Sequence, residues 1–266
     1  MDTDYYRKLN KDLSTPFYNK ATQERTAPGS TFKPVTAIAG LSEGVITDND
    51  YIYCGGRFDK LQGAPLNCWL LSGHGALSIR DGIANSCNVF FSTIGFELGK
   101  DSEGNFSEAR SLGMLQKYAS LMGLDKKTGI EISEASPQIS DKNAVPSYMG
   151  QGTNMFTTSQ LARYASTIAT SGTIYKLSLL DRVTDSKGKL IKEYPSETEG
   201  QLDISSNIWD DIHDGMYRVV QTHDQFNGLG VEVAGKTGTA EIDYYHPNNA
   251  LFVGYAPVSE PKYAIS

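Results

Sequence analysis

Apolar residues recur at a helical spacing in several stretches of the chain. The first such stretch follows the turn at Pro28-Gly29 and ends at Gly44, so it predicts a helix over residues 30–43. Pro34 is compatible with the first turn of that helix because its missing N–H has no partner there anyway. The apolar stripe consists of Val35, Ile38, Ala39 and Leu41.

Capping residues predict three further helical segments. Ser78 with Asp81, Ser107, and Thr157 with Gln160 each stand just before an apolar stripe, where a side-chain oxygen can accept from a free backbone N–H. The first of these segments is interrupted near 85–88, which predicts two short helices. Gly123 and Gly172 mark the ends of the other two, and a last stripe predicts one more helix through Ile208, Ile212, Met216 and Val219.

Strand signals are concentrated in the last part of the chain. Alternation predicts a hairpin of 177–183 with 189–193, a short strand at 231–233, and strands at 251–255 and 262–265. The stretch 48–75 is irregular and predicts a loop, and no sustained period is present before Ala27. Helices in the middle with strands gathered at the end predict an α+β fold.

Composition narrows the class of protein. The chain has 266 residues, 39% apolar, and a net charge of −7, enough for one large or two small domains. No Lys/Arg-rich run is present, which argues against nucleic acid as a partner. No apolar run approaches the ~20 residues of a membrane helix, and no secretory signal is visible at the start. Three cysteines are too few for a disulfide framework.

The first motif whose side chains could take part in a reaction is Ser30-Thr31-Phe32-Lys33. Residues three apart share one face of a helix, so the Lys33 amine can reach the Ser30 hydroxyl. A serine hydroxyl is a weak nucleophile at neutral pH, and a desolvated lysine can serve as its base. Alone, the motif fits equally a helix cap followed by a solvated lysine.

Two further motifs follow along the chain. Ser86-Cys87-Asn88 lies in the interrupted helical stretch, and Lys236-Thr237-Gly238-Thr239 follows the alternating residues 231–233. On a strand, the hydroxyls of Thr237 and Thr239 point to one face, and Gly238 lets another chain approach the backbone. Each motif alone also fits a structural role, the last one an exposed hairpin edge.

In the order Ser-x-x-Lys, Ser-x-Asn, Lys-Thr-Gly, the three motifs form the signature of penicillin-binding proteins and class A β-lactamases. The residues that flank these motifs resemble those of class B penicillin-binding proteins of the elongation type. The resemblance extends from about Asn19 to the end of the chain. The resemblance is carried also by 19–23, by Gly150-Gln151-Gly152 with 157–162, and by 250–257. A β-lactamase is disfavoured because no Glu-x-x-Leu-Asn stands between Asn88 and Lys236.

The resemblance implies a penicillin-binding transpeptidase fold of the α+β class, an antiparallel sheet packed with helices plus an all-α subdomain. The whole chain, 1–266, would be a partial transpeptidase domain. A helical subdomain is expected over about 45–225, and the sheet-bearing part over 226–266 together with the nucleophile helix 30–43. Members of the family carry additional strands before and after these residues, so the sequence is expected to be truncated at both ends.

The implied activity is a penicillin-sensitive D,D-transpeptidase that cross-links peptidoglycan stem peptides through an acyl-enzyme on Ser30. By resemblance, Lys33 takes the Ser30 proton, Ser86 relays a proton to the leaving amine, and Lys236 keeps the potential positive. Asn88 orients the substrate amide. The substrate carboxylate and oxyanion would be held by Thr237, Gly238, Thr239 and the backbone N–H groups of Ser30 and Thr239. The alternative is a non-catalytic fragment, or a β-lactam sensor that acylates without turnover.

The implied partners are D-Ala-D-Ala stem peptides, β-lactam antibiotics and, in the full-length protein, a membrane-embedded glycan polymerase. The implied location is the extracytoplasmic face of the bacterial cell membrane, with the anchor outside this sequence. The chemistry itself requires no cofactor.

A second candidate site consists of the three cysteines and one histidine. Cys54, Cys68, His74 and Cys87 make a complete tetrahedral donor set for zinc, although their spacing is not that of a common zinc finger. Some elongation-type class B proteins are similar here, which implies a metal clamp beside the active site. Two alternatives stay open, a disulfide between Cys54 and Cys68 or three ordinary buried thiols.

The other three histidines belong to none of these motifs. His213 and His223 lie on or after an amphipathic segment and are interpreted as surface or capping residues, and His246 as part of a solvated loop.

Overall fold

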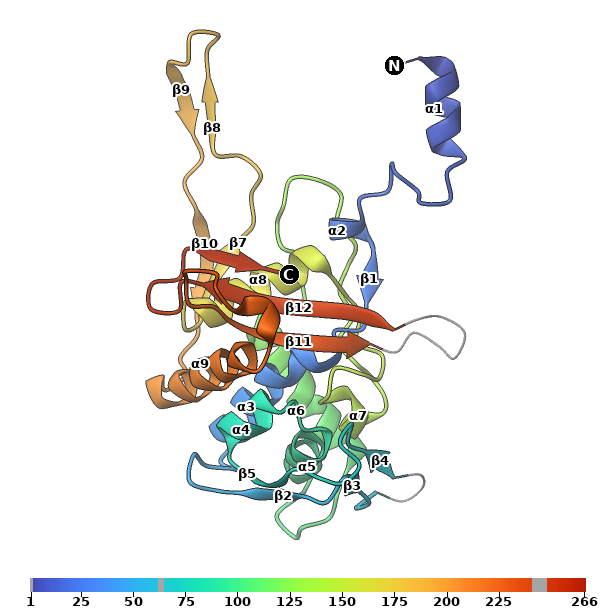
Figure 1. Cartoon of the computed structure of the whole chain (residues 1–266), viewed down its shortest axis with the longest axis vertical. Helices are drawn as coiled ribbons and strands as arrows, with labels where there is room; N and C mark the ends of the chain where they lie inside the picture. The colour runs from blue at the N-terminus through green and yellow to red at the C-terminus, as the bar shows by residue number, and fades with distance from the viewer. Residues whose placement is uncertain (1, 62–64, 241–247) are drawn as a thin grey trace.

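The last three strands of the chain form an antiparallel sheet at the centre of the molecule (Figure 1). The computed structural model describes residues 2–61, 65–240 and 248–266. β11 (Ala234–Ala240) pairs with β12 (Asn249–Ala256), which pairs with β13 (Tyr263–Ile265). In this register Lys236 lies opposite Val253. The sheet therefore carries the third motif on β11, one edge of the three-stranded arrangement.

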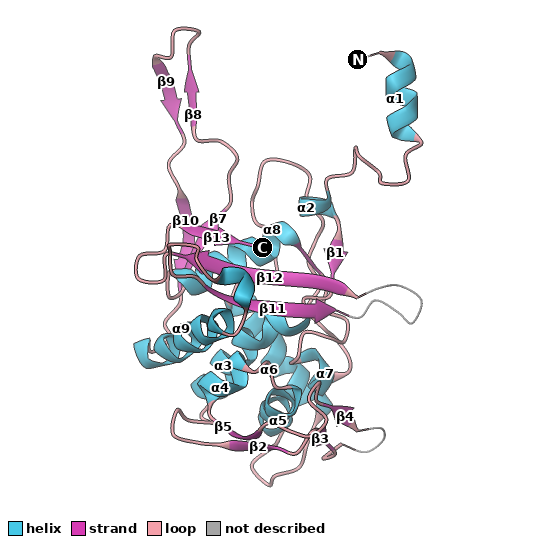
Figure 2. Ribbon diagram, in the orientation of Figure 1, coloured by secondary structure: helices cyan, strands magenta, loops and turns pink. Residues whose placement is uncertain are grey.

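Helices cover this sheet and continue below it (Figure 2). α8 (Thr158–Ala169) packs against β12 and β13, and α9 (Ser206–Gln221) packs against β11. α3 (Lys33–Ser42) contacts both α9 and the helices of the lower part. Those lower helices are α4 (Ile79–Ala84), α5 (Asn88–Leu98), α6 (Glu108–Leu121) and α7 (Ala144–Ser147). The predicted α+β class is confirmed.

The helix predicted over 30–43 is present, but its first turn is tighter than an α-helix. A 3₁₀ turn, η1 (Gly29–Phe32), carries Ser30 and runs directly into α3. Pro34 stands in the first turn of α3, and Gly44 follows its end with a φ of +67°. The two cooperating residues of the first motif therefore belong to two different helical geometries.

The predicted caps are confirmed at three helices. The side chains of Ser78, Ser107 and Thr157 accept from backbone N–H groups at the starts of α4, α6 and α8. At α8 the reciprocal bond from the Thr157 N–H to Gln160 completes a capping box. The interruption predicted near 85–88 separates α4 from α5, and the last predicted helix is α9.

Several strand predictions need correction. The stretch 48–75, predicted as a loop, contains short paired strands because neighbouring segments supply their backbone partners. These are β2 (Ile52–Cys54) with β5 (Gly75–Leu77), and β3 (Arg57–Phe58) with β4 (Leu66–Asn67). The strand predicted at 231–233 was placed too early, since β11 begins at Ala234 and includes the third motif itself.

Two projections leave the compact body at the same end (Figure 1). One is the hairpin of β8 (Arg182–Thr184) and β9 (Leu190–Glu193), whose first strand begins later than predicted. The other is α1 (Thr3–Asn10), a helix without buried residues that no periodicity had predicted.

Short elements complete the chain. They are α2 (Lys20–Gln23), β1 (Arg25–Thr26), β6 (Phe156–Thr157), β7 (Thr173–Lys176), β10 (Glu197–Gln201) and η2 (Asp224–Phe226). Among the described residues, no helix has both the length and the apolar character needed to cross a membrane.

One continuous apolar core joins the sheet to the lower helices, from Val253 through Ile38 to Phe91. Its packing leaves no room for a side chain at Gly95 of α5. A Cβ there would stand 2.4 Å from the ring of Tyr148, whose hydroxyl donates to the Ser111 carbonyl at 2.7 Å. The ring is thus held from both sides, and the glycine is a packing requirement of the core.

We expect Gly95→Ala to lower the free energy of unfolding by about 1–3 kcal/mol, because the added methyl overpacks a fixed ring. The matched control is Gly113→Ala on the exposed face of α6, where a Cβ meets nothing within 4 Å. That change is expected to raise the stability by about 0.5–1 kcal/mol through helix propensity. Urea unfolding measures both, and a stabilised Gly95 variant would contradict the packing argument.

Candidate active site

The amine of Lys33 lies at the centre of the site. It is fully buried, and its three N–H groups donate to the Ser86 carbonyl at 2.6 Å, to the Ser86 hydroxyl at 3.1 Å and to Asn88 Oδ1 at 2.8 Å. These bonds join the first and second motifs across more than fifty residues of sequence. A buried lysine amine is costly unless all of its donors are used, and here they are.

The break between α4 and α5 aims Ser86 at this amine. Ser86 has a φ of +50°, a left-handed conformation that is uncommon outside glycine and asparagine. Its N–H donates to the Ile83 carbonyl, and the N–H of Cys87 donates to the Gly82 carbonyl, so the end of α4 is capped by its own turn. The strained residue therefore presents both its carbonyl and its hydroxyl to Lys33.

Asn88 is the first residue of α5 and bridges two parts of the site. Its Oδ1 accepts from Lys33, and its Nδ2 donates to the Asn67 carbonyl at 3.3 Å. The side-chain amide is thus oriented by partners on both sides.

β11 brings the third motif against the turn that carries Ser30. A Cβ on Gly29 would lie 2.5 Å from the Thr239 carbonyl oxygen, and one on Gly238 would lie 2.9 Å from the Pro28 carbonyl oxygen. Gly29 also has a φ of +53°. Only glycine permits this approach of two backbones, and the approach places Ser30 beside Thr239.

A second backbone closes on the same turn from the other side. The N–H of Gly29 donates to the Gly150 carbonyl at 3.0 Å, and a Cβ on Gly150 would stand 1.8 Å from the Gly29 carbonyl oxygen. The Gly-Gln-Gly segment that the sequence resemblance singled out therefore packs against the turn that carries Ser30.

These elements enclose a cleft of about 600 Å³. Six of the residues that the sequence predicted for the site line it: Ser30, Ser86, Asn88, Thr237, Gly238 and Thr239. Lys33 and Lys236 are fully buried, and Lys236 Nζ donates to the Thr237 carbonyl at 3.0 Å. Among the described residues, the expected hydrogen bond between Lys33 and the Ser30 hydroxyl is not formed, because Ser86 and Asn88 take all three donors.

Burial sets the protonation of the two lysines. Removal from water lowers the pKa of Lys33 to about 7. Burial also lowers the pKa of Lys236 well below its usual range, and the nearby charge of Lys33 adds to this effect. At neutral pH the site therefore has an amine that can accept a proton.

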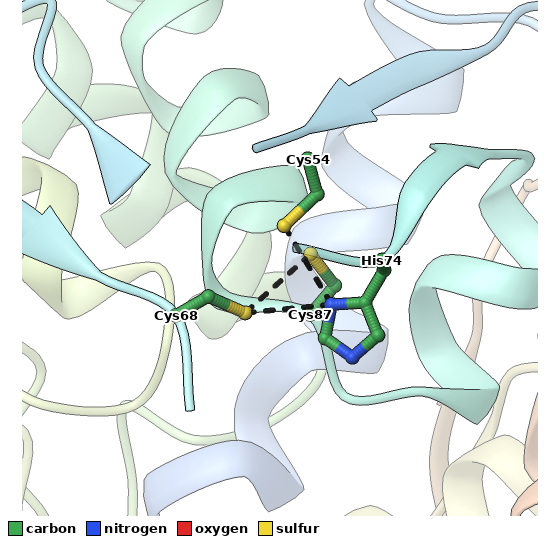
Figure 3. A group of neighbouring side chains, drawn as sticks. All are labelled: Cys54, Cys68, His74 and Cys87. Atoms are coloured by element: carbon green, nitrogen blue, oxygen red, sulfur yellow. Dashed lines mark hydrogen bonds between the residues drawn. The ribbon is translucent and has the colours of Figure 1, made fainter. Parts of the chain in front are cut away.

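The cysteines and His74 form a compact cluster next to this site (Figure 3). His74 Nδ1 lies 3.6 Å from Cys54 Sγ and 3.5 Å from Cys68 Sγ, and the sulfurs of Cys68 and Cys87 are 3.9 Å apart. All four donor atoms lie within 4.8 Å of one another, so the cluster can hold a metal ion. The three cysteines are free, so the structure contains no Cys54–Cys68 disulfide.

The thiols of the cluster interact with one another. The hydrogen bond between Cys68 and Cys87 lowers the pKa of the Cys68 thiol and raises that of the Cys87 thiol. Cys87 Sγ also accepts from the Phe90 N–H at 3.4 Å, which caps the start of α5. The cluster is therefore joined to the second motif through the residue between Ser86 and Asn88.

The family model for the penicillin-binding protein transpeptidase domain matches residues 2–266. The chain belongs to this family. It is 26% identical over 297 residues to the peptidoglycan D,D-transpeptidase MrdA of Escherichia coli, a match that covers 98% of this chain and 45% of that protein. The peptidoglycan D,D-transpeptidase PbpA of Mycolicibacterium smegmatis is 27% identical over 276 residues, covering 99% of this chain and 53% of its own.

A solved structure shows the same fold. It is the penicillin G acyl-enzyme complex of penicillin-binding protein A from M. tuberculosis, with a TM-score of 0.80 and 23% identity over 98% of this chain and 59% of that one. The chain thus spans about half the length of the curated relatives it matches. The resemblance to elongation-type class B proteins and the transpeptidase fold are confirmed.

The structure of this transpeptidase domain adds residues to the cleft that no motif had indicated. Trp69, Asn85, Met149, Thr222 and His223 also line it. His223 stands at the predicted capping position, before η2, but its place in the cleft wall was not predicted. The segments that carry these additional cleft residues lie far apart in the sequence. The only feature of the sequence that could have indicated them is that Trp69 follows Cys68 and Asn85 precedes Ser86.

The interpretation of His213 as a surface residue is wrong. Its ring is partly buried between α9 and the sheet, where Nδ1 hydrogen-bonds with the Tyr255 hydroxyl and Nε2 with Ser171 Oγ at 3.1 Å. Burial lowers the pKa of His213. His246 lies outside the described residues.

Proposed function

We propose that this chain carries the acyl-transfer site of a penicillin-sensitive D,D-transpeptidase, with Ser30 as the nucleophile. The observation that carries the proposal is the buried Lys33 amine, which is bonded to Ser86 and Asn88 next to the cleft that contains Ser30. A lysine with a pKa of about 7 is suited to accept a proton at neutral pH.

In the first half-reaction, the neutral Lys33 amine accepts the proton of the Ser30 hydroxyl while Ser30 Oγ attacks the carbonyl carbon of the penultimate D-alanine. The neutral amine has two N–H groups and one lone pair, so it gives up one of its three hydrogen bonds to the second motif, and its lone pair accepts from the Ser30 hydroxyl when substrate binds, since catalytic bonds commonly tighten only in the complex. The backbone N–H groups of Ser30 and Thr239 stabilise the oxyanion, and each such donor contributes about 3–4 kcal/mol in other acyl-transfer enzymes.

Collapse of the tetrahedral intermediate breaks the C–N bond to the terminal D-alanine. Ser86 relays a proton to the leaving amine, and Asn88 orients the substrate amide. Thr237 and Thr239, with Gly238 between them, bind the terminal carboxylate. Lys236, whose Nζ donates to the Thr237 carbonyl, becomes protonated when the substrate carboxylate binds, because a nearby anion favours the charged form, and it then supplies the positive potential for that carboxylate. The amine of a second stem peptide then attacks the Ser30 ester and forms the cross-link.

The proposed substrates follow from this chemistry. They are peptidoglycan stem peptides ending in D-Ala-D-Ala, and β-lactams act as inhibitors because their strained amide acylates the same serine. A relative's structure is described as a penicillin G acyl-enzyme complex, which supports this part of the proposal. In the full-length protein the domain would work on the extracytoplasmic side of the bacterial cell membrane, next to a membrane-embedded glycan polymerase.

We further propose that Cys54, Cys68, His74 and Cys87 bind a structural zinc ion. A tetrahedral site with ordinary zinc bond lengths places sulfurs about 3.8 Å apart and sulfur and nitrogen about 3.6 Å apart. Three of the six donor separations, at 3.9, 3.6 and 3.5 Å, are close to these edges, and all six lie within 4.8 Å. The metal would supply no step of the chemistry, and its ligands would fix the residue between Ser86 and Asn88.

Benzylpenicillin is expected to form one stable covalent adduct per chain, detected by intact-mass spectrometry. Ser30→Ala removes the adduct because it removes the nucleophile, whereas the exposed Ser14→Ala retains it as a matched control. Folded protein without an adduct, or an adduct that survives in Ser30→Ala, would contradict the proposal.

The acylation rate is expected to rise with pH through a midpoint near 7 and to level off above it. Only the neutral Lys33 amine accepts a proton, and its fraction rises through its pKa of about 7. Lys33→Ala is expected to lower the rate on the order of 10²–10⁴-fold. Rapid-mixing measurements with benzylpenicillin between pH 5.5 and 8.5, about one and a half units either side of that pKa, test this. An acylation rate that does not change with pH over this range would contradict the assignment of Lys33 as the base.

Purified native protein is expected to contain one zinc ion per chain by elemental analysis. His74→Ala is expected to lose the ion and to lower the unfolding temperature, because binding to the folded state adds to its stability. This variant leaves the second motif unchanged, so the loss reports on the cluster. Metal-free native protein, or a Cys54–Cys68 disulfide found by peptide mapping, would overturn the zinc site.

A further inference from the structure

Trp69 is a large aromatic side chain held in an exposed position. It is 62% exposed, yet its indole N–H donates to the Asn85 carbonyl at 2.9 Å and its ring meets the His74 ring edge-on at a centroid distance of 5.0 Å. Two contacts on different segments therefore fix the ring. Tryptophan is enriched among the residues that dominate binding energies, and this one lines a cleft.

The ring belongs to the same cleft as the nucleophile. Trp69 lines it together with Ser30 and Thr239, on the wall formed by Asn85 and Ser86. Thr237 and Thr239 of β11 line the same cleft. The residue that anchors the indole, Asn85, immediately precedes Ser86, the proposed proton relay to the leaving amine. Trp69 therefore flanks the side of the cleft where the leaving group departs.

We propose that Trp69 determines acceptor specificity by packing against the aliphatic part of the leaving D-alanine and then of the incoming amine. This inference rests on the proposed function. The acyl-enzyme ester has two fates. Attack by an amine forms a C–N bond, breaks the C–O bond to Ser30 and returns a proton to the Ser30 oxygen, whereas attack by water forms a carboxylic acid instead. An apolar wall favours the amine because it gains contact with the carbon chain and displaces water.

The cysteine cluster positions this wall. Trp69 follows Cys68 directly and contacts His74, so two of the four cluster residues hold the segment that carries the indole. The neighbouring Asn67 carbonyl accepts from Asn88. The same short segment therefore orients one residue of the second motif and presents the aromatic face.

The test measures how the acyl-enzyme divides between the two fates. The full chain is given a D-alanyl thioester donor with either D-leucine or glycine as acceptor, and the amide and acid products are quantified. Trp69→Ala is expected to lower the amide-to-acid ratio about tenfold with D-leucine, the size of effect expected when a small apolar contact is lost. The ratio with glycine, which has no side chain to pack, is expected to change little, and Trp69→Phe retains most of the D-leucine preference.

A direct binding readout uses the two tryptophans of the chain. Trp209 is 3% exposed, and its indole N–H is buried without a partner among the described residues, so Trp209→Phe leaves no acceptor unpaired. In that variant Trp69 is the sole tryptophan, and excitation at the red edge of its absorption band selects it over the tyrosines. Adding D-leucine to this variant in the absence of a β-lactam is expected to shift the Trp69 emission to shorter wavelength, and adding glycine is not.

The outcomes separate the two levels of the proposal. If the wild-type chain forms no benzylpenicillin adduct, the proposed function is contradicted, and so is the role of Trp69, which depends on it. A normal adduct with an unchanged product ratio in Trp69→Ala contradicts the role of Trp69 alone. The role is also overturned if the ratio falls equally with D-leucine and glycine, or falls together with zinc content and penicillin acylation, because these results indicate a structural part only.

Discussion

The burial of one amine constrains the rest of the site. Lys33 sits at the junction between η1 and α3, where its three N–H groups must all be satisfied away from water. Ser86 and Asn88 meet that requirement because Ser86 lies in the break between α4, which ends at Ala84, and α5, which begins at Asn88. The left-handed backbone of Ser86 is the local cost of this arrangement, offset by hydrogen bonds to a group with a lowered pKa. The break between α4 and α5 and the buried Lys33 amine thus depend on each other.

Glycines let the remaining walls approach this centre. The turn that carries Ser30 contacts the Thr239 carbonyl on one side and the Gly150 carbonyl on the other, through Gly29. Side chains at these positions would push β11 and the Gly-Gln-Gly segment away from Ser30. The cysteine cluster acts on another part of the cleft lining, because Cys87 caps α5 and Trp69, which follows Cys68, contacts His74. The cleft is therefore held in one part by backbone contact and in another by a compact donor cluster.

Local signals predicted the elements that depend on local bonds. The caps at Ser78, Ser107 and Thr157 and the interruption before α5 need only residues a few positions apart, and all are confirmed. Predictions failed where partners are distant. β2 to β5 are too short to show alternation and exist through pairing across loops, and His213 is buried because the sheet that covers it comes from the end of the chain.

By itself, the sequence determined the family, through three motifs in a fixed order, and the composition of the donor cluster, because residue identity and order are properties of the chain. Only the tertiary structure decided which groups Lys33 binds, how far burial lowers its pKa, and that Trp69 faces the cleft. Hydrogen bonds and desolvation depend on which distant segments exclude water from a group. That exclusion is a property of packing, which no local pattern of residues contains.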